Sequence, residues 1–186
     1  MSGNQEFTNS EQHEPSRENI EKLKSLIKTL ETAMLTTQST KTKSLHSRPM
    51  YMQKLEFDGQ SLWFFTRKAS IKCDEVQQNS DANLSFSDVK TATWLSLIGK
   101  VTVVEDKEKM EELWNEILRA WFPKGLEEPD MCLLRFDIEG AEYWDEYASR
   151  MVQLYSYFKA IATGKSYEPT KDQNMKIDMG KAQPTF

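Results

Sequence analysis

Histidine and cysteine are scarce in this chain of 186 residues, which contains only two of each. The two cysteines, Cys73 and Cys132, are far apart in the sequence and form no CxxC pair, so a disulfide framework is not expected. The absence of such a framework is typical of a reducing compartment, and we expect the protein to be cytoplasmic. Because imidazole and thiolate ligands are so few, we expect no transition-metal site built by the chain.

Long hydrophobic runs are also missing. The longest, Trp94 to Ile98, is interrupted by Ser96 and is far shorter than the roughly 20 residues that a membrane-spanning helix needs. Residues 1–18 are polar and contain no apolar segment of the kind that a secretory signal requires. We therefore expect neither secretion nor a membrane partner.

Positive charge does not dominate, because 24 Lys and Arg residues stand against 29 Asp and Glu residues and the net charge is −5. General nucleic-acid binding requires a clustered excess of positive charge, so nucleic acid is not expected as a partner. A local basic pocket for one anionic ligand is still compatible with this balance. The low counts of glycine (7) and proline (6) exclude a fibrous or low-complexity chain.

The common catalytic motifs are absent from the chain. None of GxSxG, GxxxxGK[ST], GxGxxG or HExxH occurs. His13 lies in the polar N-terminal segment, and His46 stands alone near the start of a predicted strand. The sequence therefore identifies no catalytic residue, and any redox chemistry would have to come from a bound cofactor.

The hydrophobic pattern predicts one domain between two polar ends. Residues 1–16 lack apolar periodicity and are predicted to form a disordered leader, and residues 165–186 are predicted to form a C-terminal tail. The domain between them, residues 17–164, is long enough for one hydrophobic core but not comfortably for two.

Short links between strands predict an α+β fold with a mostly antiparallel barrel of about six or seven strands and flanking helices. Asp58-Gly59 is a hairpin-turn sequence, and Gly99 in the middle of a long strand predicts a bend or bulge. The pattern predicts helices over 18–31, from Ser70 to about 79, over 107–122 and over 149–163, and strands over 33–37, 45–55, 61–66, 82–89, 91–104, 131–137 and 141–145.

Three short segments could together bind a flat, phosphorylated ligand: Arg48-Pro49-Met50, Trp63-Phe64-Phe65-Thr66, and Ser70 with Lys72. Arginine, lysine, hydroxyl groups and a helix N-terminus supply what a phosphate needs, and Pro49 frees one ladder position because it has no N–H. Strand alternation directs Trp63 and Phe65 to one face and Phe64 and Thr66 to the other. The same residues also fit a plain structural interpretation, in which the charges are solvated and the aromatic side chains form the core.

The order and spacing of these segments resemble the pyridoxamine 5′-phosphate oxidase-like flavin-binding split barrels. Three later segments resemble the general stress protein 26 branch of that family, and the similarity covers about residues 18–150. These segments are Trp94-Leu95-Ser96-Leu97-Ile98-Gly99 with Val101, then Trp121-Phe122-Pro123-Lys124-Gly125, and Ala141-Glu142-Tyr143-Trp144-Asp145.

The resemblance implies a homodimer of split β-barrels that binds FMN, or the related FAD, in a cleft between subunits. It implies that Arg48 and Lys72 bind the phosphate with donors from Thr66 and Ser70, and that Met50, Trp63, Phe64 and Phe65 line the groove for the ring. Trp121 and Trp144 are candidates for the subunit interface. The true oxidase carries a basic, histidine-bearing C-terminal segment, which this chain lacks, so oxidation of pyridoxamine 5′-phosphate is not expected.

Four functions are compatible with the sequence. The protein could be a flavin-dependent oxidoreductase, or a non-catalytic flavin-binding protein that serves storage, sensing or stress protection. A third possibility keeps the barrel but binds haem or a deazaflavin, with His46 as the only histidine of the predicted domain. The fourth is a cofactor-free barrel used for protein contacts, in which Arg48 and Lys72 are ordinary surface charges.

Overall fold

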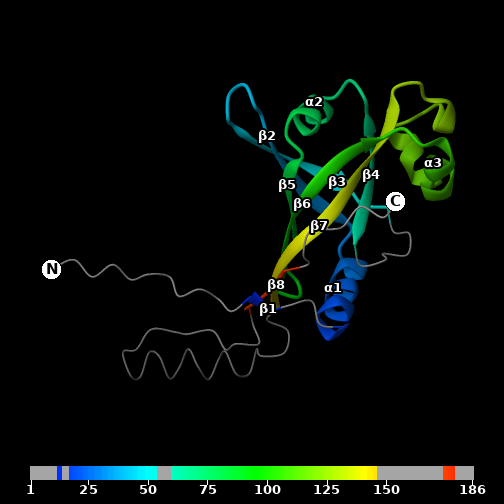
Figure 1. Ribbon diagram of the computed structural model, residues 1–186. Coiled ribbons are helices and arrows are strands. Elements are labelled where there is room, and N and C mark those ends of the chain that lie inside the picture. The colour runs from blue at the N-terminus through cyan, green and yellow to red at the C-terminus, as the bar shows by residue number, and fades with distance from the viewer. Residues whose placement is uncertain (1–11, 14–16, 54–59, 146–173, 179–186) are drawn as a thin grey trace, which may run out of the picture.

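The computed structural model describes residues 12–13, 17–53, 60–145 and 174–178 (Figure 1). Its helices are α1 (Arg17–Thr29), α2 (Ile71–Gln78) and α3 (Lys107–Leu113), with two 3-10 turns, η1 (Glu116–Ala120) and η2 (Gly125–Glu127). Its strands are β1 (Gln12–His13), β2 (Thr32–Gln38), β3 (Leu45–Tyr51), β4 (Ser61–Arg67), β5 (Asp81–Asp88), β6 (Thr93–Val104), β7 (Met131–Asp145) and β8 (Asn174–Asp178).

Six of the strands form an antiparallel sheet in the order β3-β2-β5-β6-β7-β4. The sheet curls into a half-barrel, so that its two end strands, β3 and β4, approach each other (Figure 1). Just beyond β3, the Gln53 N–H donates to the Trp63 carbonyl at 3.0 Å. Among the described residues β3 is paired only with β2 and β4 only with β7, so the facing edges of β3 and β4 form no ladder with each other.

Two hydrophobic clusters hold the sheet and helices together. The larger contains residues from α1 and α2 together with one face of the sheet, including Leu23, Phe64 and Phe136. The smaller one, built around Phe65 and Leu133, attaches α3 and η1 to β4 and β7. Because alternate residues of β4 enter different clusters, this strand joins the two cores.

The antiparallel α+β half-barrel confirms the predicted fold class, and most predicted elements begin and end within a few residues of the observed ones. The predicted helix over 107–122 is wrong, because α3 ends at Leu113 and a separate 3-10 turn follows. Asn115 causes the break: its side chain accepts a hydrogen bond from the Ile117 N–H and donates to Gln53 Oε1 at 2.7 Å. A polar side chain that caps a new turn thus outweighs the helical periodicity.

The last two predicted strands, 131–137 and 141–145, are one continuous strand, β7. Its first half pairs with β4 and its second half with β8, while β6 pairs along its length. The predicted irregularity at Gly99 is confirmed, because the register shifts between Ile98, opposite Gly140, and Gly99, opposite Ile138. Glu139 is therefore the extra residue of a bulge.

Replacing Gly99 with alanine is expected to destabilise the fold by roughly 1–3 kcal/mol, because a Cβ there would overlap the Asp137 carbonyl oxygen and lie 2.9 Å from the Phe136 ring. A neighbouring exposed position, Ile98→Ala, is the control and should change stability by less than about 0.5 kcal/mol. Chemical denaturation followed by circular dichroism measures both. Equal stability of the two variants would contradict the close backbone approach at the bulge.

The segments predicted as leader and tail each contribute a short strand. β1 pairs in parallel with β8, and β8 pairs with the second half of β7. The rest of the predicted leader and tail, the predicted helix over 149–163 and the Asp58-Gly59 turn lie outside the described residues. Within the described part of the chain, no helix is long and apolar enough to cross a membrane.

Candidate functional site

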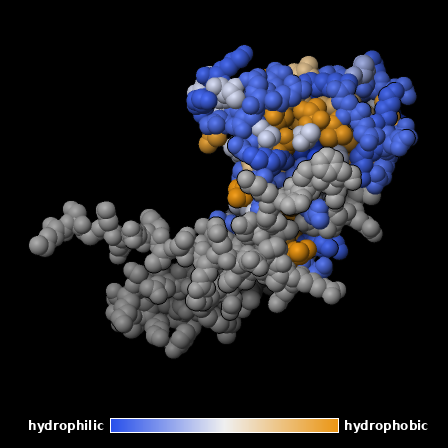
Figure 2. Space-filling model, in the orientation of Figure 1, coloured by the Kyte–Doolittle hydropathy of each residue, from blue (hydrophilic) through white to orange (hydrophobic). Residues whose placement is uncertain are grey.

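A cavity of about 540 Å³ opens between the facing edges of β3 and β4. The N-terminal turn of α2 forms one wall and η1 with the residues after it forms another. Figure 2 shows apolar surface bordered by hydrophilic residues in this upper part of the molecule, between α2 and α3. The cavity is lined by Thr32, Pro49, Met50, Tyr51, Phe65, Thr66, Arg67, Ser70, Lys72, Leu118, Trp121 and Phe122.

Lys72 brings a positive charge to the cavity from the first turn of α2. Its side chain is half-buried, and none of the ion pairs among the described residues includes it. Burial lowers the pKa of Lys72, and although Cys73 opposes this, the charge of the nearby Arg48 lowers it further. An ammonium group that has lost water without gaining a carboxylate favours an anion beside it.

Hydroxyl and backbone donors lie on the same cavity wall as Lys72. Ser70 is the N-cap of α2 by its backbone, but its hydroxyl makes no capping bond and lies 3.3 Å from Cys73 Sγ. Thr66 is buried at the end of β4 and also lines the cavity. The first N–H groups of α2 have no partner inside the helix, and their partial positive charge adds to that of Lys72. This end of the cavity suits an anion with several acceptor oxygens.

The rest of the wall is apolar and aromatic. Tyr51 of β3 and Trp121 beyond η1 are nearly parallel, with ring centroids 6.5 Å apart and an interplanar angle of 19°. Met50 and Phe65 are buried behind them. Trp121 is also held through its carbonyl, which accepts a 2.7 Å hydrogen bond from Arg67. Flat apolar walls beside a cationic end suit a ligand that joins a ring system to an anionic group.

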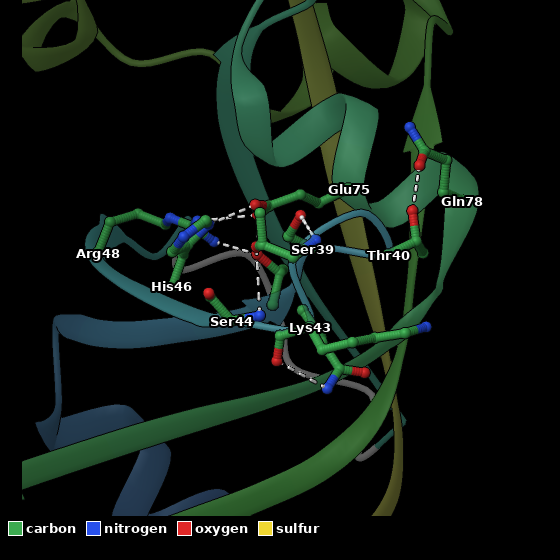
Figure 3. Close-up of polar contacts among 11 residues, drawn as sticks. Ser39, Thr40, Lys43, Ser44, His46, Arg48, Glu75 and Gln78 are labelled. Carbon is green, nitrogen blue, oxygen red and sulfur yellow. Dashed lines mark hydrogen bonds and ion pairs between the residues drawn. The ribbon is translucent and has the colours of Figure 1, made fainter.

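Arg48 lies behind this wall and not on it. Its guanidinium donates to Thr37 Oγ1 at 2.5 Å and to a carboxylate oxygen of Glu75 at 3.1 Å. Glu75, on α2, is 5% exposed and also accepts from Thr37 and shares a 2.5 Å hydrogen bond with His46 Nδ1 (Figure 3). Burial would raise the pKa of Glu75, but the hydrogen bonds from Thr37, His46 and Arg48 together lower it. This network fixes α2 to β2 and β3.

Of the residues singled out in the sequence, seven meet at the cavity: Pro49, Met50, Phe65, Thr66, Ser70, Lys72 and Trp121. Phe64 does not, because it is one of the largest fully buried side chains of the main core. Trp63 faces the smaller core, where Lys109 Nζ lies 5.3 Å from its ring centroid. Trp144 is paired with Trp94 across β6 and β7, away from the cavity wall.

A second hollow of about 300 Å³ adjoins the first, because Tyr51 lines both. Gln53 lines this hollow and is only 5% exposed, and its Nε2 has no hydrogen-bond partner among the described residues. Its oxygen is already bonded to Asn115. A buried amide donor without a partner is costly, so this hollow favours a ligand with an acceptor such as a carbonyl oxygen.

Several residues of the site were not identified in the sequence. Glu75 looks like an ordinary helix carboxylate, and only the fold brings it to Arg48 and His46. Tyr51 and Gln53 directly follow the Arg48-Pro49-Met50 segment, and strand alternation beyond Met50 could have indicated them. No cluster of three or more metal-ligating side chains occurs in the ranges that the structure describes.

Comparison with known proteins identifies the family of this chain. Residues 18–168 match the family model described as pyridoxamine 5′-phosphate oxidase like. A curated relative, protein bli-3 of Neurospora crassa, is 28% identical over 159 residues, which cover 81% of this chain and 76% of that protein.

Solved structures of other proteins share this fold. The general stress FMN/FAD-binding protein of Xanthomonas citri is 28% identical with a TM-score of 0.63, over 73% of this chain and 94% of that one. A protein related to general stress protein 26 from Clostridium acetobutylicum shares the fold at 21% identity and a TM-score of 0.62, over 72% of this chain and 92% of that one. The family match, which spans all six strands of the half-barrel, shows that the chain belongs to the pyridoxamine 5′-phosphate oxidase-like family.

Proposed function

We propose that the protein binds a flavin, FMN in the first place, in the cavity between β3 and β4. The observation that carries the proposal is Lys72, a half-buried ammonium with no carboxylate partner in the described ranges, on the wall of a cavity that is otherwise aromatic and apolar. The volume of about 540 Å³ lies within the range of roughly 300–1,000 Å³ that is typical of small-molecule sites. The flavin-binding name of the Xanthomonas citri relative supports the same ligand class.

The residues of the site fit both ends of a flavin. Lys72, Ser70 and Thr66 would bind the phosphate, and Arg48 would add positive potential from behind while it holds α2 in place. The ring would lie against Met50, Tyr51, Phe65 and Trp121. The ring would extend past Tyr51 into the second hollow, where the Gln53 amide, which has no partner among the described residues, would donate to a ring carbonyl.

We infer that the protein is a flavin-dependent oxidoreductase. A bound flavin supplies hydride or electron transfer at its ring. Among the described residues that line the cavity there is no histidine or carboxylate, and the part we assign to them is to bind and orient the flavin. Bleaching of the bound flavin by NAD(P)H would support this activity, and a flavin that no reduced nicotinamide bleaches would favour a binding or stress-protection role.

Haem fits the described cavity poorly. His46 is 2.5 Å from Glu75 and does not line the cavity, so it is not placed as an axial ligand there. Within the ranges that the structure describes, a cofactor-free barrel would leave Lys72 without a carboxylate and the Gln53 amide without an acceptor.

The full chain is expected to bind FMN in a saturable manner and to bind riboflavin at least about tenfold more weakly, because riboflavin lacks the phosphate that Lys72 would bind. Quenching of flavin fluorescence on titration with protein measures both affinities. Failure of FMN to bind, or equal affinity for the two flavins, would contradict the proposed site.

We also propose a homodimer, with the cavity in a cleft between the subunits. Trp121 on the cavity rim and Ile117 beside it are 54% and 61% exposed, and a second copy of the chain would cover them. Trp144 and Trp94 form a further aromatic pair on the sheet that could meet the partner.

Light scattering at micromolar concentration is expected to give twice the chain mass of 21.7 kDa. Ile117→Glu should produce monomers, because a charge would be buried in the interface. Leu45→Glu, at a position that is 69% exposed and belongs neither to the cavity lining nor to the Trp94–Trp144 pair, should leave the dimer intact. A monomeric wild-type chain would exclude the shared cleft.

A further inference from the structure

The only two cysteines of the chain lie side by side in the fold. Cys73 is in the first turn of α2 and Cys132 is on β7, 59 residues away, yet their sulfur atoms are 3.9 Å apart. Both thiols are free, and the residues are 1% and 0% exposed. The two sulfur atoms are in contact, at about twice the disulfide bond length of about 2.05 Å.

The two thiols differ in acidity. The hydrogen bond from Cys132 lowers the pKa of Cys73 to about 6 against the effect of burial, with help from the Ser70 hydroxyl and the charge of Lys72. The same contact with Cys73, together with burial, raises the pKa of Cys132. Cys73 is therefore the more readily ionised of the two thiols, and Cys132 lies in position to resolve an oxidised Cys73.

The pair lies directly beneath the cavity. Ser70, which lines the cavity, has its hydroxyl 3.3 Å from Cys73 Sγ. The Arg67 carbonyl is also 3.3 Å from that sulfur, and Cys132 pairs with Thr66 across β4 and β7. Because Thr66, Arg67 and Ser70 all line the cavity, only one layer of residues separates the thiols from it. Ser70 is thus the lining residue in direct contact with the Cys73 sulfur.

We propose that Cys73 and Cys132 form a reversible disulfide in reaction with hydrogen peroxide. The Cys73 thiolate attacks one peroxide oxygen and the O–O bond breaks, which leaves a sulfenic acid on Cys73 and hydroxide, which takes up a proton to become water. The Cys132 sulfur then attacks the Cys73 sulfur, its proton leaves with the hydroxyl as a second water, and the S–S bond forms. Two thiols lose two electrons and one peroxide gains them.

The cross-link would join α2 to β7. It would fix the turn that carries Ser70 and Lys72 relative to the sheet, and it would constrain the unfolded chain by closing a long loop. The inference stands on the two cysteines and does not require that a flavin occupies the cavity.

The test treats the full-length chain with hydrogen peroxide, removes the oxidant with catalase, alkylates under denaturing conditions and measures the intact mass. We expect both alkylation sites to be lost together, a mass of the unalkylated chain lower by about 2 Da, and full recovery of both thiols with dithiothreitol. The product should be intramolecular, and its thermal midpoint should exceed that of the reduced chain.

Single variants separate the two roles. Cys132→Ser should leave a sulfenic acid on Cys73 that dimedone captures, whereas Cys73→Ser should leave the Cys132 thiol unreacted. If the wild-type chain keeps both thiols, gains oxygen without a cross-link, or forms only disulfides between chains, the proposal is overturned. The wild-type measurement decides the matter even if a serine variant fails to fold.

Discussion

Replacing Glu75 with alanine is expected to lower the free energy of unfolding by about 3 kcal/mol, which is a large part of the stability of a domain of this size. The carboxylate is 5% exposed and bonds to Thr37, His46 and Arg48, so its removal leaves three polar groups without their acceptor. Arg48 and His46 are partly exposed to solvent. We therefore expect the loss of stability to lie at the lower end of the range that is observed when one partner of a buried ion pair is removed.

Urea denaturation of wild-type and variant chains measures this effect. Gln77→Ala, at an exposed position on the same helix, is the matched control and should change stability by less than about 0.5 kcal/mol. Combining Glu75→Leu with Arg48→Met should restore much of the loss, because neither partner is then left buried and charged. A Glu75→Ala chain as stable as the Gln77→Ala chain would show that the network does not hold α2.

The Glu75 carboxylate also makes the stability of the fold depend on pH in the acid range. Its pKa in the fold is below the ordinary value of 4.5, so its contribution to stability is complete above that value and disappears as the pH falls through the folded-state pKa. The stability difference between wild-type and Glu75→Gln chains should therefore shrink as the pH is lowered below about 4.5.

Lys72→Met is expected to weaken FMN binding by roughly 10- to 150-fold, which corresponds to the loss of one charge-assisted hydrogen bond of about 1.5–3 kcal/mol. Methionine keeps an unbranched side chain of similar length, so the packing at the cavity wall changes little. Affinity for riboflavin should change by less than about twofold, because the lost contact would be made to the phosphate alone.

Lys68→Ala is the control for this experiment, since Lys68 is partly exposed, pairs with Glu105 and is not among the residues that line the cavity. It should leave both affinities unchanged. If Lys72→Met weakens riboflavin as much as FMN, the lysine contributes to the shape of the cavity rather than to a phosphate site. Arg48→Ala is less informative, because it would also break the contact with Glu75.

The sequence was sufficient for the fold class and for part of the site. Alternating apolar residues and short links predict the antiparallel strands, and Gly99 marks the bulge because no Cβ fits beside Asp137. The residues near Ser70 and Lys72 were identified because phosphate chemistry is local: a helix start, a hydroxyl and a cation lie within three positions.

What the sequence could not show depends on contacts between distant residues. Glu75 holds Arg48 off the cavity wall, and Cys73 meets Cys132, only because α2 packs against β2 and β6. The aromatic run Trp63-Phe64-Phe65 divides between two cores, since β4 belongs to both. The helix predicted over 107–122 stops early because Asn115 bonds to Gln53, a partner 62 positions away.

The most direct test of the central claim is a crystal structure of the full chain with FMN. The account predicts one flavin in the cavity between β3 and β4, its phosphate within hydrogen-bond distance of Lys72 Nζ and the Ser70 hydroxyl, and its ring against Tyr51 and Trp121. A flavin bound elsewhere, or one whose phosphate does not contact Lys72, would contradict it.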